Sequence, residues 1–348
     1  MRFASLFCLT PLFLSACTTM QSIAVTPSLI SELPSTVSSS TCQSIVGTGL
    51  PSKELSNTHI VYQGYNDKGS PLLWVVSMAD GERTLLRDYP GAVSRLGFLK
   101  DGQHFLIAIG DGGHAWLGNI DGSPAIKVNL TEELLSNFQP HSPLWSELIG
   151  LPPDIVDYRN GHFHSPDGQT IASWELGDSA LTLFNTSTQI TTEVVPTGKQ
   201  DSITGRWTID GKWFIFAYMH GNSTSYYSEI LEVNPGGTEL RPLTIRFDHR
   251  AFVSPIISPD SQKIIFVDEE WPESLGVLWL ETGKLRFYPL DQSIASSYGD
   301  STVWAPNSSW VAFLSEGEQV DIRVINIDTG KIYCITQDSI RENLMDWR

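Results

Sequence analysis

Residues 257–266 read Ile257-Ser-Pro-Asp260-Ser-Gln-Lys-Ile-Ile-Phe266. Proline presets the backbone for a tight turn, and an aspartate at this place accepts hydrogen bonds from the backbone two residues further on. The apolar run after the turn is β-branched and aromatic, which favours a strand. The stretch therefore predicts a turn that leads directly into a β-strand.

The same pattern occurs five times. An apolar or aromatic residue and two more residues precede Asp or Asn, and a small residue and a β-rich run follow. The other copies cover residues 98–107, 164–173, 207–216 and 304–313. The anchors are spaced 66, 43, 50 and 47 residues apart and are Asp101, Asp167, Asp210, Asp260 and Asn307. Further strand-like runs follow each copy, and about four strands in 40–50 residues predict a propeller blade.

The two ends of the chain extend this pattern. Trp347 follows Trp304 at a spacing of 43, but the strand that should come next is found near the N-terminus, at residues 58–62. Aligning Tyr62 with Phe216 places a sixth anchor at Ser56. We therefore expect an all-β fold, a six-bladed β-propeller in which the C-terminal strand closes the first blade and removes open edges. A β-sandwich with chance turn motifs is the alternative.

The five copies resemble TolB-type propeller repeats, which carry a Ser-Pro-Asp-Gly turn. The segment from Ile335 to Trp347 looks like the end of one such repeat and the start of the next. The resemblance covers about residues 58–348 and implies the propeller fold. TolB itself has an additional N-terminal α/β domain, for which the residues before 58 leave no room, so its role in the Tol–Pal system is not implied. Similar blades in prolyl-oligopeptidase-type proteins accompany a Gly-x-Ser-x-Gly elbow, which this sequence lacks.

The first 17 residues, MRFASLFCLTPLFLSAC, predict a cleaved export signal. Arg2 leads into an apolar run of about 12 residues, too short to span a bilayer. The end of this stretch, Leu14-Ser-Ala-Cys17, resembles the lipobox of bacterial lipoproteins. That resemblance implies removal of residues 1–16 and lipidation of Cys17, and Thr18 then favours the outer membrane of a Gram-negative cell. A buried N-terminal helix that ends in Cys is the alternative.

Residues 17–57 begin with the expected lipidated Cys17 and are rich in Ser and Thr, which predicts a flexible linker before a propeller at 58–348. We expect an extracytoplasmic protein, tethered to the membrane by its lipid, on the periplasmic face or the surface of the outer membrane. Cys42 and Cys334 then remain as spare thiols. In an oxidising compartment they invite a disulfide near the seam between first and last blades, although two unpaired thiols are also compatible with the sequence.

Charge and composition exclude several classes of function. The 348 residues hold 22 Lys and Arg against 39 Asp and Glu, a formal net charge of −17. Such a chain repels phosphate backbones, so nucleic acid is not an expected partner. An aromatic content of 10% is too high for a disordered chain. We expect one folded domain and a monomer.

Two groups of residues are candidates for binding. In propellers of the resembled type the strand before each turn lines the central channel, which makes channel candidates of Arg95, His162, Arg206, Asp300 and Asp346. Loops between second and third strands share one mouth with the long insertion at 130–150. The candidate binding rim on that mouth consists of Trp145, Tyr226, Tyr227 and Trp271. Exposed aromatic side chains are good recognition residues, but each can instead pack on its own blade.

The sequence contains few signs of catalytic residues. His162 and His164 share one face of a strand, but no further ligands at metal-binding spacing accompany them. No phosphate-binding or dinucleotide-binding loop is present. We therefore predict no metal, no cofactor and no catalytic residue, and a module that binds a protein or an envelope component. The alternative is an enzyme that acts on a glycan or small molecule in the channel, with Asp300 and Asp346 as its carboxylates.

Overall fold

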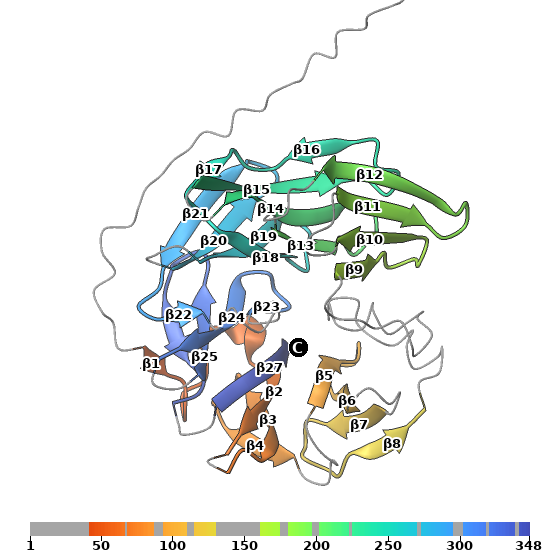
Figure 1. Ribbon diagram of the computed structural model, residues 1–348. Helices are drawn as coiled ribbons and strands as arrows, with labels where there is room; N and C mark the ends of the chain where they lie inside the picture. The colour runs from red at the N-terminus through yellow and green to blue at the C-terminus, as the bar shows by residue number, and fades with distance from the viewer. Residues whose placement is uncertain are drawn as a thin grey trace, which may run out of the picture.

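The computed structural model describes residues 42–66, 68–86, 93–109, 115–129, 161–174, 180–196, 202–222, 225–269, 273–294, 302–317, 320–337 and 341–348. Within these ranges the protein is all-β, as predicted, apart from the 3-10 helix η1 (Lys53–Leu55). None of the helical structure in these ranges is long and apolar enough to cross a membrane. The described strands form six sheets, and Figure 1 shows them arranged around a common centre beside the C-terminus.

We number the sheets along the chain. Sheet 1 contains β27 (Arg341–Trp347), β2 (His59–Tyr65), β3 (Pro71–Ser77) and β4 (Arg83–Leu86). Sheet 2 contains β5 (Val93–Phe98), β6 (His104–Ile109), β7 (Ala115–Asn119) and β8 (Ile126–Val128). Sheet 3 contains β9 (Gly161–His164), β10 (Thr170–Trp174), β11 (Ala180–Asn185) and β12 (Ile190–Pro196).

The other three sheets follow the same antiparallel order, two of them with additions. Sheet 4 contains β13 (Ser202–Trp207), β14 (Phe214–Asn222), β15 (Ser225–Val233) and β16 (Leu240–Pro242), with β17 (Phe247–Asp248) added to β15. Sheet 5 contains β18 (Phe252–Ile257), β19 (Lys263–Asp268), β20 (Ser274–Trp279) and β21 (Lys284–Pro289). Sheet 6 contains β23 (Thr302–Trp304), β24 (Trp310–Glu316), β25 (Val320–Asn326) and β26 (Ile332–Cys334), with β22 (Ser293–Ile294) and β1 (Gln43–Ser44) added.

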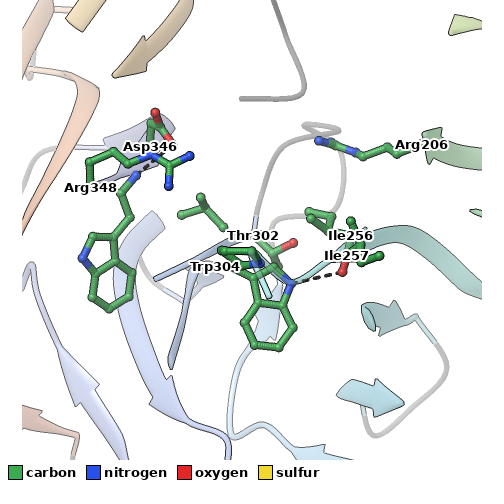
Figure 2. A pocket seen from close by; sticks show the side chains of 10 residues that line it. Arg206, Ile256, Ile257, Thr302, Trp304, Asp346 and Arg348 are labelled. Atoms are coloured by element: carbon green, nitrogen blue, oxygen red, sulfur yellow. Dashed lines mark hydrogen bonds between the residues drawn. The ribbon is translucent and has the colours of Figure 1, made fainter. Parts of the chain in front are cut away.

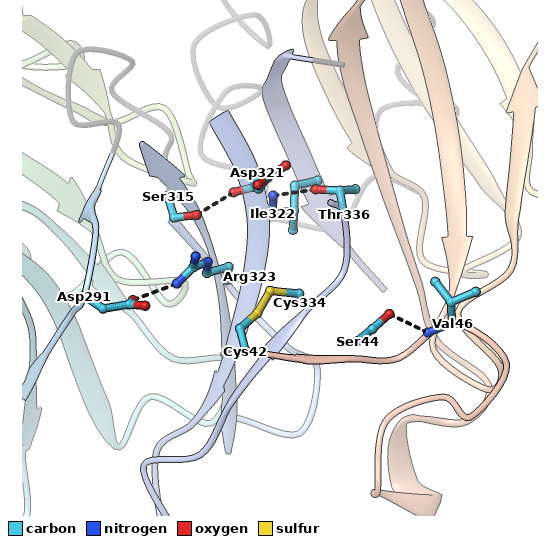
Figure 3. Close-up of a disulfide and its surroundings, with 10 residues drawn as sticks. All are labelled: Cys42, Ser44, Val46, Asp291, Ser315, Asp321, Ile322, Arg323, Cys334 and Thr336. Atoms are coloured by element: carbon cyan, nitrogen blue, oxygen red, sulfur yellow. Dashed lines mark hydrogen bonds and ion pairs between the residues drawn. A yellow bond between two sulfur atoms is a disulfide. The ribbon is translucent and has the colours of Figure 1, made fainter. Parts of the chain in front are cut away.

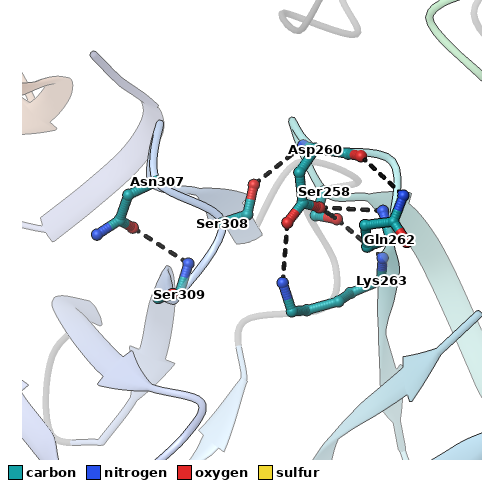
Figure 4. A network of polar contacts seen from close by, with 7 residues as sticks. All are labelled: Ser258, Asp260, Gln262, Lys263, Asn307, Ser308 and Ser309. Atoms are coloured by element: carbon teal, nitrogen blue, oxygen red, sulfur yellow. Dashed lines mark hydrogen bonds and ion pairs between the residues drawn. The ribbon is translucent and has the colours of Figure 1, made fainter. Parts of the chain in front are cut away.

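The turn at Asp260 joins β18 to β19, as the sequence predicts (Figure 4). The Gln262 N–H donates to the carboxylate of Asp260 at 3.0 Å, and the Lys263 N–H donates to the hydroxyl of Ser258 at 2.9 Å. The backbone N–H of Asp260 also donates to the hydroxyl of Ser308 at 3.0 Å, in the corresponding turn of sheet 6. At Asp260 the motif therefore satisfies polar groups of its own turn and also links sheet 5 to sheet 6.

Hydrophobic clusters fill the spaces between the sheets. In the described part of the chain, buried side chains form clusters shared by sheets 1 and 2, 3 and 4, 4 and 5, 5 and 6, and 6 and 1. Tryptophans add directional bonds to two of these interfaces. The Trp207 indole donates to the carbonyl of Phe163 in sheet 3 at 2.7 Å, and Trp304 donates to that of Ile256 in sheet 5 at 3.1 Å. Large apolar rings thus pack between sheets while their polar N–H groups remain satisfied.

Sheet 1 is assembled from both ends of the described chain. The last strand, β27, pairs antiparallel with β2, and Trp347 lies opposite Ile60. Trp347 is fully buried, and its indole donates to the Thr58 hydroxyl at 3.0 Å. The predicted partnership between the last strand and the first strands of the repeat region is therefore present in the sheet pairing.

The segment 42–57 corrects the predicted linker boundary. It was expected to belong to the flexible linker 17–57, but Ile45, Leu50 and Leu55 are buried in the cluster shared by sheets 6 and 1. Gly49 has a φ of +67°, and a Cβ there would lie 1.9 Å from the carbonyl oxygen of Ala79. Within the described residues, the packed unit therefore includes the segment 42–57. The Ser- and Thr-rich composition of the segment did not reveal that these three apolar residues are buried.

A disulfide holds this segment at the seam. Cys42 is bonded to Cys334 on β26, with the two Cα atoms 5.5 Å apart (Figure 3). Next to the bond, β1 runs parallel to β26 with Gln43 opposite Tyr333. The pairing of the two cysteines is the one that their isolation in the sequence suggests, and it fastens the N-terminal segment to sheet 6 immediately before the chain enters sheet 1.

Candidate functional site

A pocket lies where first strands of several sheets approach one another (Figure 2). Its empty volume is about 360 Å³, part of it open to solvent. The lining residues are Arg206, Ile256, Ile257, Pro259, Thr302, Val303, Trp304, Asp346, Trp347 and Arg348. The fold thus brings together two channel candidates, Arg206 from β13 and Asp346 from β27.

The structure describes the other channel candidates only in part. Arg95 lies in β5 and His162 in β9, the first strands of their sheets, as predicted. The side chains of both residues and the whole of Asp300 lie outside what the structure describes. Only Arg206 and Asp346 can therefore be assigned to the pocket.

Asp346 is buried, with 4% of its surface exposed. One carboxylate oxygen accepts a hydrogen bond from the Phe98 N–H at 2.8 Å, and the other accepts one from the Trp347 N–H at 2.9 Å. Burial raises the pKa of Asp346, and the nearby Arg348 and these backbone donors oppose that rise. Because Phe98 belongs to β5, this carboxylate connects sheet 1 to sheet 2, which is a structural role.

Arg348 brings a second guanidinium to the pocket beside that of Arg206. Burial lowers the pKa of Arg348, while the neighbouring Asp346 opposes the shift. Its Nε atom is buried and has no hydrogen-bond partner among the described residues. Sequence reasoning missed Arg348 and Thr302 as pocket residues. In the sequence, only their positions could have indicated them as pocket residues: Arg348 directly follows Trp347, and Thr302 lies two residues before Trp304.

The hairpin of β14 and β15 carries the two rim candidates that the structure describes. Both strands have nine residues, and the pairing continues to Asn222 opposite Ser225. The neighbouring β13 reaches only to Ser202, opposite Met219, so the hairpin extends beyond it. Tyr226 and Tyr227 are half-buried near the tip. Trp145 and Trp271 lie outside the described residues.

The two tyrosines pack against histidine and arginine side chains. The guanidinium carbon of Arg246 lies 4.5 Å from the centre of the Tyr227 ring, and the ring of His220 lies 5.3 Å from it. The His249 ring meets the Tyr226 ring edge-on at 5.7 Å. We call this set the rim patch: His220, Tyr226, Tyr227, Arg246 and His249.

The small strand β17 positions the basic members of the rim patch. Asp248 pairs with Tyr227 in the sheet, which places Arg246 and His249 beside the hairpin. Sequence reasoning missed both residues. The available signal was the segment 241–250, RPLTIRFDHR, which holds three arginines and a histidine in a strongly acidic chain. A cation above an aromatic ring is attracted to the face of that ring, so the patch is a pre-assembled aromatic and basic surface.

The rim patch and the pocket lie towards opposite ends of sheet 4. Near the pocket end, Arg206 pairs with Ile215 and Trp207 with Phe214. Towards the patch end, Ser202 pairs with Met219, and the hairpin continues beyond this point to its tip. The two places can therefore bind different ligands, and a variant in one need not disturb the other.

The described ranges contain no group of three or more His, Cys, Asp or Glu residues that could hold a metal ion. Asp346 is the one acidic side chain that lines the pocket in these ranges, and both of its oxygens accept backbone hydrogen bonds. What the described pocket offers a ligand is thus guanidinium groups, a hydroxyl and apolar surface.

Comparisons with known proteins define the class of fold. No family model and no curated protein matches the chain. Among solved structures, TolB from Acinetobacter baumannii matches with a TM-score of 0.51 and 14% identity, over 83% of this chain and 66% of that one. The fold is therefore a TolB-like β-propeller, in a chain that is not TolB itself and that spans 66% of the TolB length.

Two further solved structures are similar at lower scores. A protein described as a TolB from Agrobacterium tumefaciens gives a TM-score of 0.42 and 15% identity, over 80% of this chain and 89% of that one. An oligogalacturonate lyase in complex with manganese gives 0.37 and 12%, over 80% and 84%. At these scores neither structure bears on the function of this chain.

The raised pKa of Asp346 predicts a pH-dependent effect of the variant Asp346→Asn. In the folded protein the pKa lies above its ordinary value of 3.8. The wild type therefore loses stability as the pH rises through the interval between the unfolded and folded pKa values, and the loss persists at higher pH. Asparagine does not titrate. The free energy of unfolding of the variant relative to wild type should thus be higher at pH 7 than at pH 4.

Urea unfolding of both proteins at the two pH values measures this difference. The change should be less than about 1.4 kcal/mol for each unit by which the pKa is raised, because part of the loss has already occurred at pH 4. The missing acceptor for the Phe98 N–H affects the variant at both pH values and cancels in the comparison. Asp248→Asn, at an exposed position in β17, serves as the control. An equal difference between Asp346→Asn and wild type at pH 4 and pH 7 would contradict the assignment.

Proposed function

We propose that this protein is a lipid-anchored, extracytoplasmic β-propeller that binds a protein or an envelope component through the rim patch. The observation that carries the proposal is the patch itself, in which Tyr226 and Tyr227 lie near the tip of an extended hairpin with cationic and histidine side chains against their rings. Rigid aromatic side chains supply contact area with little loss of conformational entropy, and arginine is enriched with them at binding hot spots.

We propose further that the six sheets are the six blades of one closed ring. Supporting this are the pairing of β27 with β2 and the shared hydrophobic clusters at the interfaces named above. A closed ring gives the rim patch a rigid base, and a preorganised surface loses less entropy when it binds. It also leaves no open sheet edge at the seam.

The net charge of the chain limits the choice of partner. The whole chain carries a formal charge of −17, so most of its surface repels an acidic partner. In the rim patch, Arg246 and two histidines accompany the tyrosines, and the carboxylates of Glu229 and Asp248 belong to the same strands. Arg246 also lies 3.6 Å from the carboxylate of Glu229, which orients its guanidinium beside the Tyr227 ring. Electrostatic complementarity with a partner chiefly sets orientation and association rate.

The enzyme alternative receives less support. Hydrolysis of a glycosidic bond commonly uses two carboxyl groups, one on each side of the bond. In the described pocket Asp346 is engaged by two backbone donors, and the second carboxylate of that hypothesis, Asp300, lies outside the described residues. A binding function without catalysis is compatible with the pocket residues that the structure describes.

The anchor is proposed at Cys17, with the protein held on the outer membrane by its lipid. Cys42 is fixed to sheet 6 by its disulfide, and 24 residues lie between Cys17 and Cys42. Fully extended, such a segment spans at most about 80 Å. A tether of this reach would let the propeller meet a partner at a distance from the membrane surface and turn the rim patch towards it.

The rim patch predicts loss of partner capture in the double variant Tyr226→Ala/Tyr227→Ala. Chemical crosslinking in intact cells, followed by purification of this protein, should recover the partner with wild type and at least about tenfold less with the variant, as expected for hot-spot aromatics. The control is Ile190→Ala, which removes an exposed apolar side chain from β12. Undiminished capture by a double variant with an unchanged melting temperature would refute the assignment.

The proposed anchor predicts that Cys17→Ala abolishes metabolic labelling with palmitate and releases the protein from the membrane fraction. Cys8→Ala is the matched control, because Cys8 belongs to the segment expected to be removed, and this variant should keep its label. Labelling that persists in Cys17→Ala would show that the lipid, if any, is attached elsewhere.

A further inference from the structure

The pocket between the first strands contains two guanidinium groups. In Figure 2 the side chain of Arg206 enters from β13, and that of Arg348 enters from the opposite side, after β27. We propose that this pocket binds one small oxyanion, the carboxylate or phosphate group of a ligand, between Arg206 and Arg348. This site lies away from the rim patch and goes beyond the proposed function.

The charges of the described pocket favour an anion. Arg206 and Arg348 contribute two positive charges, and Asp346 is the one acidic side chain among the lining residues. Because both oxygens of Asp346 accept backbone hydrogen bonds from Phe98 and Trp347, this carboxylate is only partly available to the guanidinium groups. Among its side chains, the described lining thus holds two guanidinium groups and one carboxylate, in a chain whose overall charge is strongly negative.

A buried hydrogen-bond donor without a partner lies on a residue that lines the pocket. The Nε atom of Arg348 is buried without a hydrogen-bond partner in the described residues. Leaving a charged donor buried and unpaired is costly, and an oxygen acceptor in the pocket would remove this cost. The planar guanidinium presents its donors as a fork that matches carboxylate and phosphate oxygens, so an oxyanion fits it better than a neutral group does.

The rest of the lining strengthens such an interaction. Apolar side chains surround the two arginines, among them Ile256, Val303 and Trp304. Charge–charge attraction is stronger where such groups exclude water. The hydroxyl of Thr302 adds one neutral polar group at the same place. The empty space of about 360 Å³ includes open solvent, so a ligand held by one oxyanion group can extend outward from the pocket.

Isothermal titration calorimetry on the purified whole chain tests the proposal. The probes are inorganic phosphate and succinate, titrated separately at constant ionic strength with chloride as the balancing anion. We expect saturable binding of at least one of them, and the preferred probe shows whether the site takes phosphate or carboxylate. Failure of both probes to bind overturns the proposal.

Variants locate the binding. Arg348→Gln and Arg206→Gln should each raise the Kd at least tenfold, and Arg348→Lys, which keeps the charge but loses the fork, should raise it less than Arg348→Gln. Arg286→Gln is the control, because Arg286 packs over the Tyr288 ring in sheet 5 and does not line the pocket. Unchanged affinity in a folded Arg348→Gln, or equal weakening by the control, overturns the assignment.

The oxyanion site and the rim patch can fail separately. The double variant Tyr226→Ala/Tyr227→Ala should bind the preferred anion as the wild type does. A loss of anion binding in this variant that matches the loss in Arg348→Gln would show that the pocket residues do not define the site.

Discussion

Every sheet in this protein is small, and its stability depends on burying apolar faces against the neighbouring sheets. Isolated sheets of a few short strands are marginal in water. Here the shared clusters between neighbours bury rings such as Phe214, Phe266 and Trp347. The indole bonds of Trp207 and Trp304 add direction, because each reaches the first strand of the preceding sheet. In the described part of the chain, this contact between sheets also positions the strands that line the pocket.

The first and last described segments of the chain, residues 42–57 and β27, meet at the interface of sheets 6 and 1, and the pocket lies next to this seam. The strand β27 completes sheet 1 and also carries Asp346 into the pocket, with Arg348 directly after it. On the outer side, the disulfide from Cys42 holds the N-terminal segment to sheet 6. Closing so long a loop stabilises the fold by on the order of 5 kcal/mol in the chain-entropy description. The proposed tether therefore leaves from a fixed point.

Much of the fold could be predicted because turn chemistry repeats locally. The motif around Asp260 sets a turn within a few residues, and its spacing then gives the sheets and the partner of β27. The packing of Ile45, Leu50 and Leu55 could not be predicted, since they are scattered in a polar segment without alternation. In the candidate site, Tyr226 and Tyr227 could be predicted as aromatic residues of a loop between two strands. The basic residues beside them could not be predicted, because the non-local pairing of β17 with β15 brings them there.

The pairing of β2 with the last strand, β27, in one sheet brings Asp346 and Arg348 to the pocket. Hydrogen exchange followed by mass spectrometry tests it most directly, by comparing the backbone amides of β27 with those of β2. We predict that the two strands exchange at similar, slow rates, because they lose protection together when sheet 1 opens. Exchange of β27 at the rate of an unstructured peptide, while β2 and β3 remain protected, would contradict it.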